Sequence, residues 1–158
     1  MLKRLRVIAF IPMIIMMITI WMFSSNNGET SSNQSLGIVG RVIHVVERIT
    51  GHSFDAEGRE VWEERLHTPV RKLAHMMEYL VFSLTVAFPF VLYRRSKRWI
   101  SIFTMLFCVA YAATDEIHQL FVPNRAGRFV DVLIDGIGII GGVLIFRKVY
   151  GRFHSSEN

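Results

Sequence analysis

Two short stretches of the chain carry side chains whose types and spacing could support proton transfer. The first, "DEIHQ", begins at Asp115, and the second, "DVLID", begins at Asp131. Histidine titrates near neutral pH, so His118 could relay a proton while a neighbouring carboxylate fixes its tautomer. In a helix, Asp115, His118 and Gln119 would share one face, because they are three and four residues apart. We therefore predict an acid–base function for these stretches.

A third stretch, "RKLAHMMEY", adds a cation to the same kinds of group. Arg71, His75 and Glu78 follow one another at i, i+4 and i+7, which places them on one stripe of a helix. A guanidinium group binds a phosphate or carboxylate with two parallel hydrogen bonds. The stretch therefore predicts anion binding beside a second histidine–carboxylate pair.

The candidate site residues fall into two groups. The predicted acid–base and orienting residues are His75, Glu78, Asp115, His118, Asp131 and Asp135. The predicted substrate-binding residues are Arg71, Lys72, Glu116, Gln119, Arg125 and Arg128. No cofactor is predicted. A divalent metal is a less favoured alternative, because the H-x-x-E and D-E-x-H patterns are weak, although nitrogen and oxygen ligands are available.

The elements that carry these residues have the composition of membrane spans. Hydrophobic residues make up 51% of the 158, and the mean hydropathy is +0.35. A helix needs about 20 apolar residues to cross a bilayer, and runs of about this length occupy 7–23, 73–93, 99–121 and 129–146. The prediction is an all-α integral membrane bundle of four transmembrane helices with a short extracytoplasmic helical segment. A large soluble catalytic domain is excluded.

The chain is thereby divided into five parts. They are a cytoplasmic N-terminus (1–6), a first transmembrane helix (7–23), an extracytoplasmic segment (24–71), a core with three further spans (72–147) and a cytoplasmic tail (148–158). The first span is expected to be an uncleaved anchor, since it is longer than a signal-peptide core and no A-x-A site follows it. The polar stretch 24–35 is expected to be an irregular linker.

Two helices are predicted in the rest of the extracytoplasmic segment. Apolar residues recur at helical spacing from Leu36 to Ile49, which indicates an amphipathic helix on the membrane surface or against the bundle. A short helix over 57–66 is expected to end at Thr68, before Pro69.

The distribution of basic residues predicts the orientation. Lysine and arginine cluster before the first span, between the second and third spans (94–98), and after the fourth span (147–152). These regions lie on one side if the spans alternate, so the positive-inside rule places both termini in the cytoplasm. Topology accounts for the net charge of +5, and no basic, aromatic-rich stripe predicts nucleic-acid binding.

This orientation brings the candidate residues to one depth. Asp115 lies 17 residues beyond Arg98, which is roughly 25 Å across the bilayer, and the polar residues of the second and fourth spans lie in their first two turns. Charged groups facing lipid cost a few kcal/mol each, so these side chains should face one another or water. A cavity at the outer face is one interpretation, and a structural clamp between helix ends is the other.

Two glycines of the fourth span have the spacing of a close helix contact. Gly138 and Gly142 form a G-x-x-x-G pair, which lets a second helix approach closely. The contact can form within the chain or through self-association with another copy.

The three motif stretches together resemble the VanZ-like family of bacterial membrane proteins. The resemblance rests on "RKLAHMMEYLVFSL" from Arg71, "AYAATDEIHQLFVPNRAGRFVDVLIDGIGIIGG" from Ala110, and "FSSNNGETSSNQS" after the first span. It covers nearly the whole chain in order, and the family's polar motif positions fall on the candidate residues. It implies a multi-pass protein of the bacterial cytoplasmic membrane and a link with resistance to the glycopeptide antibiotic teicoplanin, but it implies no reaction.

The leading hypothesis is that the cavity binds or acts on an envelope lipid or a lipid-linked cell-wall intermediate with a phosphate-bearing head group. Whether the protein is an enzyme is left open. The alternative is a non-catalytic binding or shielding protein whose polar cluster is a helix clamp. A proton-coupled transporter is less favoured, because the spans lack polar residues at the midplane.

Overall fold

The computed structural model describes residues 2–155, which form helices joined by short connections. The helices are α1 (Leu2–Ile8), α2 (Ile11–Ser25), α3 (Gly28–Thr50), α4 (Ala56–Leu92), α5 (Lys97–Gln119) and α6 (Phe129–Ser155). Four stretches are long and apolar enough to cross a membrane: Arg4–Ser25, Ala56–Leu92, Lys97–Gln119 and Phe129–Tyr150. The prediction of an all-α protein with four spanning helices is therefore confirmed.

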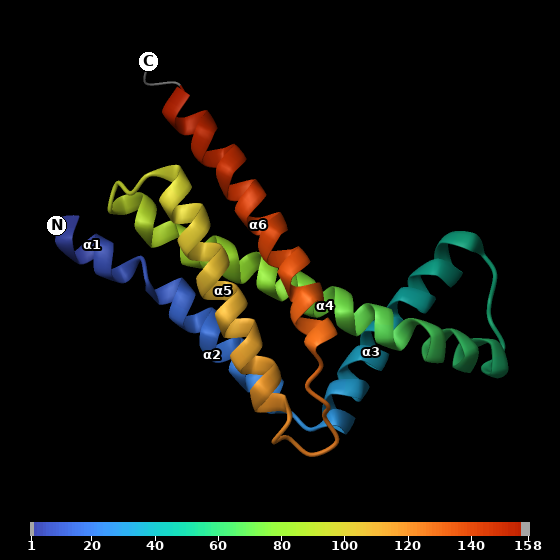
Figure 1. Ribbon diagram of the computed structural model, residues 1–158. Helices are drawn as coiled ribbons and strands as arrows, with labels where there is room; N and C mark the ends of the chain where they lie inside the picture. The colour runs from blue at the N-terminus through green and yellow to red at the C-terminus, as the bar shows by residue number, and fades with distance from the viewer. Residues whose placement is uncertain (1, 156–158) are drawn as a thin grey trace.

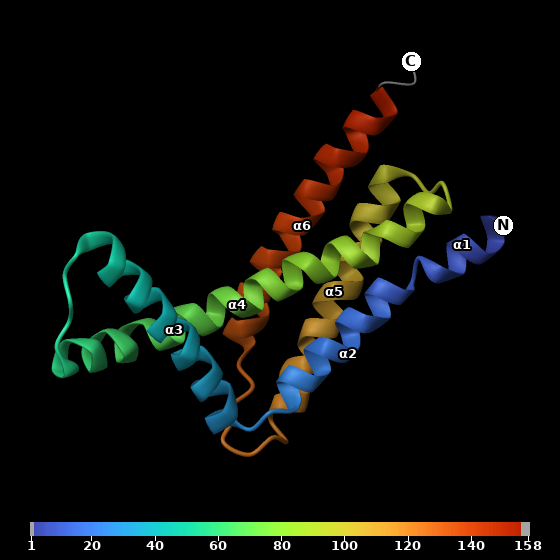
Figure 2. The same cartoon turned by 180° about the vertical axis from the view of Figure 1, so that it is seen from behind.

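The helices form a bundle and a projecting arm (Figure 1). The bundle contains α2, α5, α6 and the second half of α4, whereas α3 and the first half of α4 form the arm. The start of α1, the end of α6 and the α4–α5 connection lie at one end of the bundle, and the α2–α3 and α5–α6 connections lie at the other (Figure 2). We call the latter the motif end, because all three polar motifs lie toward it. The predicted tail, 148–158, continues α6 as far as Ser155, and 156–158 lie outside the described residues.

The first span is interrupted near its start. The sequence predicted one run over 7–23, but α1 ends at Ile8 and α2 begins at Ile11. Pro12 stands in the first turn of α2. Proline has no N–H to donate to the carbonyl four residues earlier and clashes with it, so the helix restarts instead of continuing.

The predicted linker over 24–35 is wrong, because α3 begins at Gly28. The side chain of Asn27 accepts a hydrogen bond of 2.8 Å from the amide of Thr30 and caps the helix. Ser31 and Ser35 are buried one turn apart, and they extend the buried stripe of α3 toward its N-terminus. Small polar residues thus pack against a neighbouring helix where composition had indicated a linker.

The predicted end of a helix before Pro69 is also wrong, because α4 runs through Pro69 without a break. The proline leaves one carbonyl, that of Arg65, without its helical partner, and Arg65 is exposed. Packing on both sides of this point holds the helix together, since α3 covers its first half and the bundle covers its second half.

The arm is closed at its tip by a capped turn and an ion pair. Gly51 ends α3 in the left-handed conformation, with φ of 68°. Asp55 caps α4 by accepting a hydrogen bond of 2.8 Å from the amide of Gly58. Glu47 accepts hydrogen bonds of 2.8 and 2.9 Å from Arg59 and one of 2.9 Å from the amide of Phe54. The turn and the start of α4 are therefore held against the end of α3.

The bundle core lies where α6 approaches α4. Gly138 and Gly142 face α4, and a Cβ atom at either position would clash with α4, at the carbonyl oxygen of Met76 and the side chain of Ser83 respectively. The close helix contact predicted from the glycine spacing thus takes place within the chain. Around it the core contains Ile20, Tyr79, Phe82, Val86, Cys108, Ala112, Ile139 and Val143.

The outer surface of the bundle is apolar. Leu106 of α5 and Leu144 of α6 are 67% and 60% exposed, as is expected for side chains that face lipid.

Candidate functional site

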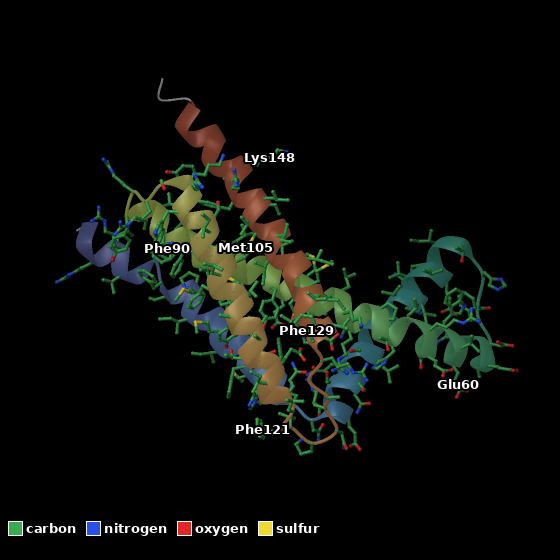
Figure 3. All side chains as sticks on the ribbon, in the orientation of Figure 1. Glu60, Phe90, Met105, Phe121, Phe129 and Lys148 are labelled. Atoms are coloured by element: carbon green, nitrogen blue, oxygen red, sulfur yellow. The ribbon has the colours of Figure 1, made fainter. Side chains whose placement is uncertain are left out.

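The polar motif residues gather at the motif end of the bundle. They come from the middle of α4, the end of α5, the α5–α6 connection and the first two turns of α6. Figure 3 shows Phe121 and Phe129 at the two ends of this connection. Two adjoining cavities lie here, and together they contain most of the predicted site residues.

The smaller cavity, which we call the polar pocket, has a volume of about 380 Å³. It lies between α4, the end of α5, the α5–α6 connection and α6. It is lined by Thr68, Arg71, Lys72, His75, Glu116, Gln119, Asn124, Arg125, Ala126, Arg128, Asp131, Ile134 and Asp135. The structure therefore brings together predicted residues from each of the three motifs.

The larger cavity, which we call the groove, has a volume of about 790 Å³ and lies between α2, α3 and α4. Its apolar lining includes Met16, Phe23, Ile38, Met77 and Val81, and its polar lining includes Gln34, Arg41 and Glu78. Arg71, His75 and Arg125 line both cavities. A ligand in either cavity would therefore lie close to these three side chains.

Arg71 is the cation in these cavities that is best suited to bind an anion. It makes no hydrogen bond or ion pair with any other side chain in the described part of the chain. Burial lowers the pKa of the neighbouring guanidinium of Arg125, and the like charge of Arg71 lowers it further. Two nearby guanidinium groups that repel each other form a site whose charge an anion would neutralise.

His75 is paired with Glu78 inside the groove. The Nδ1 atom of His75 lies 3.6 Å from Oε2 of Glu78, and both side chains are largely buried. Oε1 of Glu78 is buried and has no hydrogen-bond partner among the described residues. An imidazole oriented by a carboxylate can donate or accept a proton.

The two carboxylates on α6 differ in whether they have a cationic partner. Oδ1 of Asp131 lies 3.6 Å from Nζ of Lys72, so this carboxylate has a cationic partner. Asp135, one turn further along α6, is only 3% exposed and makes no hydrogen bond or ion pair within the described residues.

Arg125 joins the α5–α6 connection to α2. Its guanidinium donates hydrogen bonds to the carbonyl oxygens of Phe23, at 2.9 Å, and Asn26, at 3.1 Å, and to Oε1 of Gln119 at 3.3 Å. Gln119 in turn donates to Oδ2 of Asp115 at 3.1 Å. The prediction assigned Arg125 to a bound anion, but most of its donors satisfy the end of α2 and the α5 side chains.

Asp115 and Glu116 support the site from within. Asp115 is 3% exposed and lines neither cavity. Glu116 accepts a hydrogen bond of 2.7 Å from the backbone amide of Arg128, just before α6. Glu116 was predicted to bind substrate, and its observed contact positions the start of α6.

His118 is not in either cavity. Its ring stacks on Trp21 of α2 with centroids 3.9 Å apart, and its Nε2 atom lies 3.1 Å from Oγ of Ser25. The two histidines predicted as an acid–base pair are therefore placed apart, with His75 in the cavities and His118 between α5 and α2.

Several lining residues were missed by the reasoning from sequence. Gln34, Ile38 and Arg41 of α3 line the groove, and part of α3 had been assigned to a linker. The available signal was the spacing of Ser31 and Ser35, which places two small residues on the same face as the following apolar stripe.

Among the side chains that the structure describes, those of residues 4–150, no three histidine, cysteine, aspartate or glutamate side chains converge closely enough to hold a metal ion.

The comparison with protein families gives one match. The sequence profile described as VanZ/LLP1 matches residues 9–150, which include all three polar motifs. No curated protein and no solved structure shows a significant match.

Proposed function

The chain belongs to the VanZ/LLP1 family, and from this premise we propose that it binds an envelope lipid or a lipid-linked cell-wall intermediate with a phosphate-bearing head group. The membrane is the bacterial cytoplasmic membrane, and the termini are cytoplasmic. The motif end, and with it the site, then lies at the outer face.

The observation that carries the proposal is an unpaired arginine at the polar end of an apolar groove. A guanidinium group that is partly removed from water and has no anionic partner carries an uncompensated desolvation cost. A phosphate on Arg71 would offset this cost with charge-assisted hydrogen bonds of about 1.5–3 kcal/mol each. Met16, Met77 and Val81, which line the same groove, provide an apolar surface for an acyl chain.

We propose that the site binds the lipid, and we assign a chemical role only to His75 and Glu78, which lie beside the head group. The His75–Glu78 pair supplies a proton donor and acceptor within the groove. Retention of a cell-wall precursor by such a site would change susceptibility to glycopeptide antibiotics, and we extend the proposal to teicoplanin on that ground.

The test compares lipid binding by three forms of the purified protein. Wild type, R71A and R48A are titrated with phosphatidylglycerol, and bound lipid is counted by native mass spectrometry. Arg48 is a matched control, because it is an exposed arginine on the arm that lines neither cavity. Loss of one charge-assisted contact corresponds to about a tenfold weaker affinity for R71A, whereas R48A should bind like wild type.

A neutral lipid separates head-group recognition from general partitioning. Diacylglycerol, which lacks the phosphate, should bind all three forms equally weakly. Equal binding of phosphatidylglycerol to wild type and R71A would contradict the proposal. In cells that produce matched amounts of protein, R71A and H75N should reverse any change in teicoplanin susceptibility that the wild-type protein causes.

A further inference from the structure

We propose that the polar pocket selects a head group in which the phosphate is followed by an ammonium group, with Asp135 as the counter-ion of that ammonium. The inference rests on the proposed function and specifies the class of lipid. It concerns the polar pocket, whereas the proposed function rests on Arg71 and the groove.

The first step is the state of Asp135. This carboxylate lines the polar pocket and is only 3% exposed. It has no hydrogen bond or ion pair in the described part of the chain. Burying an uncompensated carboxylate is costly, so a buried group of this kind needs a cationic or hydrogen-bonding partner.

The second step is that the protein's own cations do not provide this partner. Lys72 lies against Asp131, and Arg125 donates to carbonyl groups and to Gln119. The charge of a protonated His75 also acts on Asp135, but the two groups are too far apart to form an ion pair, and the Nδ1 atom of His75 lies 3.6 Å from Oε2 of Glu78. The pocket therefore offers one acidic position that a ligand's cation can fill.

The third step is that the same pocket also offers unpaired positive charge. Arg71 and Arg128 line it, and neither guanidinium has a hydrogen-bond or ion-pair partner in the described residues. A purely anionic head group would satisfy the arginines and leave Asp135 uncompensated, and a purely cationic one would do the reverse. A phosphate linked to an ammonium group matches both kinds of charge.

The size of the pocket agrees with such a head group. A volume of about 380 Å³ is at the small end of ligand sites, which suits a compact polar group rather than an acyl chain. Because Arg71 lines both cavities, a phosphate bound there can join a tail in the groove to an ammonium in the pocket.

The experiment uses two lipids that differ only in the amine. Phosphatidylethanolamine and phosphatidylethanol share the phosphodiester, and only the first carries the ammonium group. Both are titrated into full-length wild type, D135N and E60Q by native mass spectrometry. Glu60 is the control, because it is an exposed acid far out on the arm (Figure 3).

Wild type and E60Q should bind phosphatidylethanolamine about tenfold more tightly than phosphatidylethanol, the effect of one charge-assisted contact. D135N should bind both lipids equally, with the affinity for phosphatidylethanol retained. Free O-phosphoethanolamine is added as a competitor. Displacement of the lipid would identify a soluble source for the same head-group chemistry, and failure to displace would assign the lipid.

Three results would overturn the inference. Equal affinities of wild type for the two lipids, or an unchanged preference in D135N, would remove Asp135 as a selector while leaving the proposed lipid site intact. Absence of binding of either phospholipid to wild type would remove the proposed function together with the inference. The wild-type comparison needs no variant, so the test stands if D135N fails to fold.

Discussion

The close contact between α4 and α6 can be tested at a single glycine. A Cβ atom at Gly138 would lie 2.9 Å from the carbonyl carbon of Met76 and 3.2 Å from the amide nitrogen of Leu80. Carbon atoms normally pack about 3.5–4.0 Å apart, so G138A should push α6 away from α4 by on the order of 1 Å. Overpacking of this kind costs about 1–3 kcal/mol. It would also move Asp135, one turn away, relative to His75.

Gly136 is the matched control. A Cβ atom there meets nothing within 4 Å, so G136A should be neutral or stabilise the helix by up to about 1 kcal/mol. The single cysteine, Cys108, is buried in the core, so its reaction with a thiol-reactive dye on heating reports unfolding. G138A should melt roughly 2–16 °C below G136A, because the two variants differ by about 1–4 kcal/mol and 1 kcal/mol corresponds to about 2–4 °C at this chain length. Equal melting temperatures would refute the helix contact that positions the site.

Three further predictions concern the arm, the connection and the orientation. The hydrogen bond from the Phe54 amide lowers the pKa of Glu47, so the contribution of this carboxylate to stability is present above its unfolded pKa and is lost as pH falls through the lowered folded value. The protection of backbone amides from hydrogen exchange at the tip of the arm, corrected for the intrinsic exchange rate, should therefore fall below about pH 4. E47Q should abolish this dependence on pH. R125A should lower stability by about 1–3 kcal/mol because it removes the hydrogen bonds from the guanidinium to the carbonyl oxygens of Phe23 and Asn26, and an unchanged melting temperature would contradict the assigned contacts. A cysteine at Ser53 should react with an impermeant maleimide in intact cells and one within 94–98 should not; the reverse pattern would invert the orientation.

The spans and most of the pocket could be predicted because both depend on the cost of polarity in lipid. Long apolar runs identified the spanning helices, and the ionisable groups inside them had to face one another. Depth along each helix then followed from the rise of 1.5 Å per residue.

The neighbouring helix that each side chain of α5 contacts could not be predicted in the same way. Successive residues turn by 100°, so relative to Asp115 the side chain of Gln119 lies at about +40°, His118 at about −60° and Glu116 at about +100°. His118 and Glu116 therefore point in nearly opposite directions. Only the positions of α2 and α6 decide that His118 meets Trp21 while Glu116 meets the start of α6.

The arm escaped prediction because local signals and packing disagree there. Polar composition indicated a linker before Leu36, and Pro69 indicated a helix end. In the structure, Ser31 is buried in α3 and α4 continues through the proline. Tertiary packing outweighs both local preferences.

The central claim, that the groove holds a lipid phosphate at Arg71, can be tested by photo-crosslinking. A phosphatidylglycerol with a photoactivatable acyl chain is incorporated with the protein into nanodiscs, and the labelled peptides are mapped by mass spectrometry. Ile38, Met77 and Val81 in the groove should be labelled in wild type, and this labelling should be lost in R71A. Labelling spread evenly over the lipid-facing surface, including Leu106 and Leu144, and unchanged in R71A, would contradict the central claim.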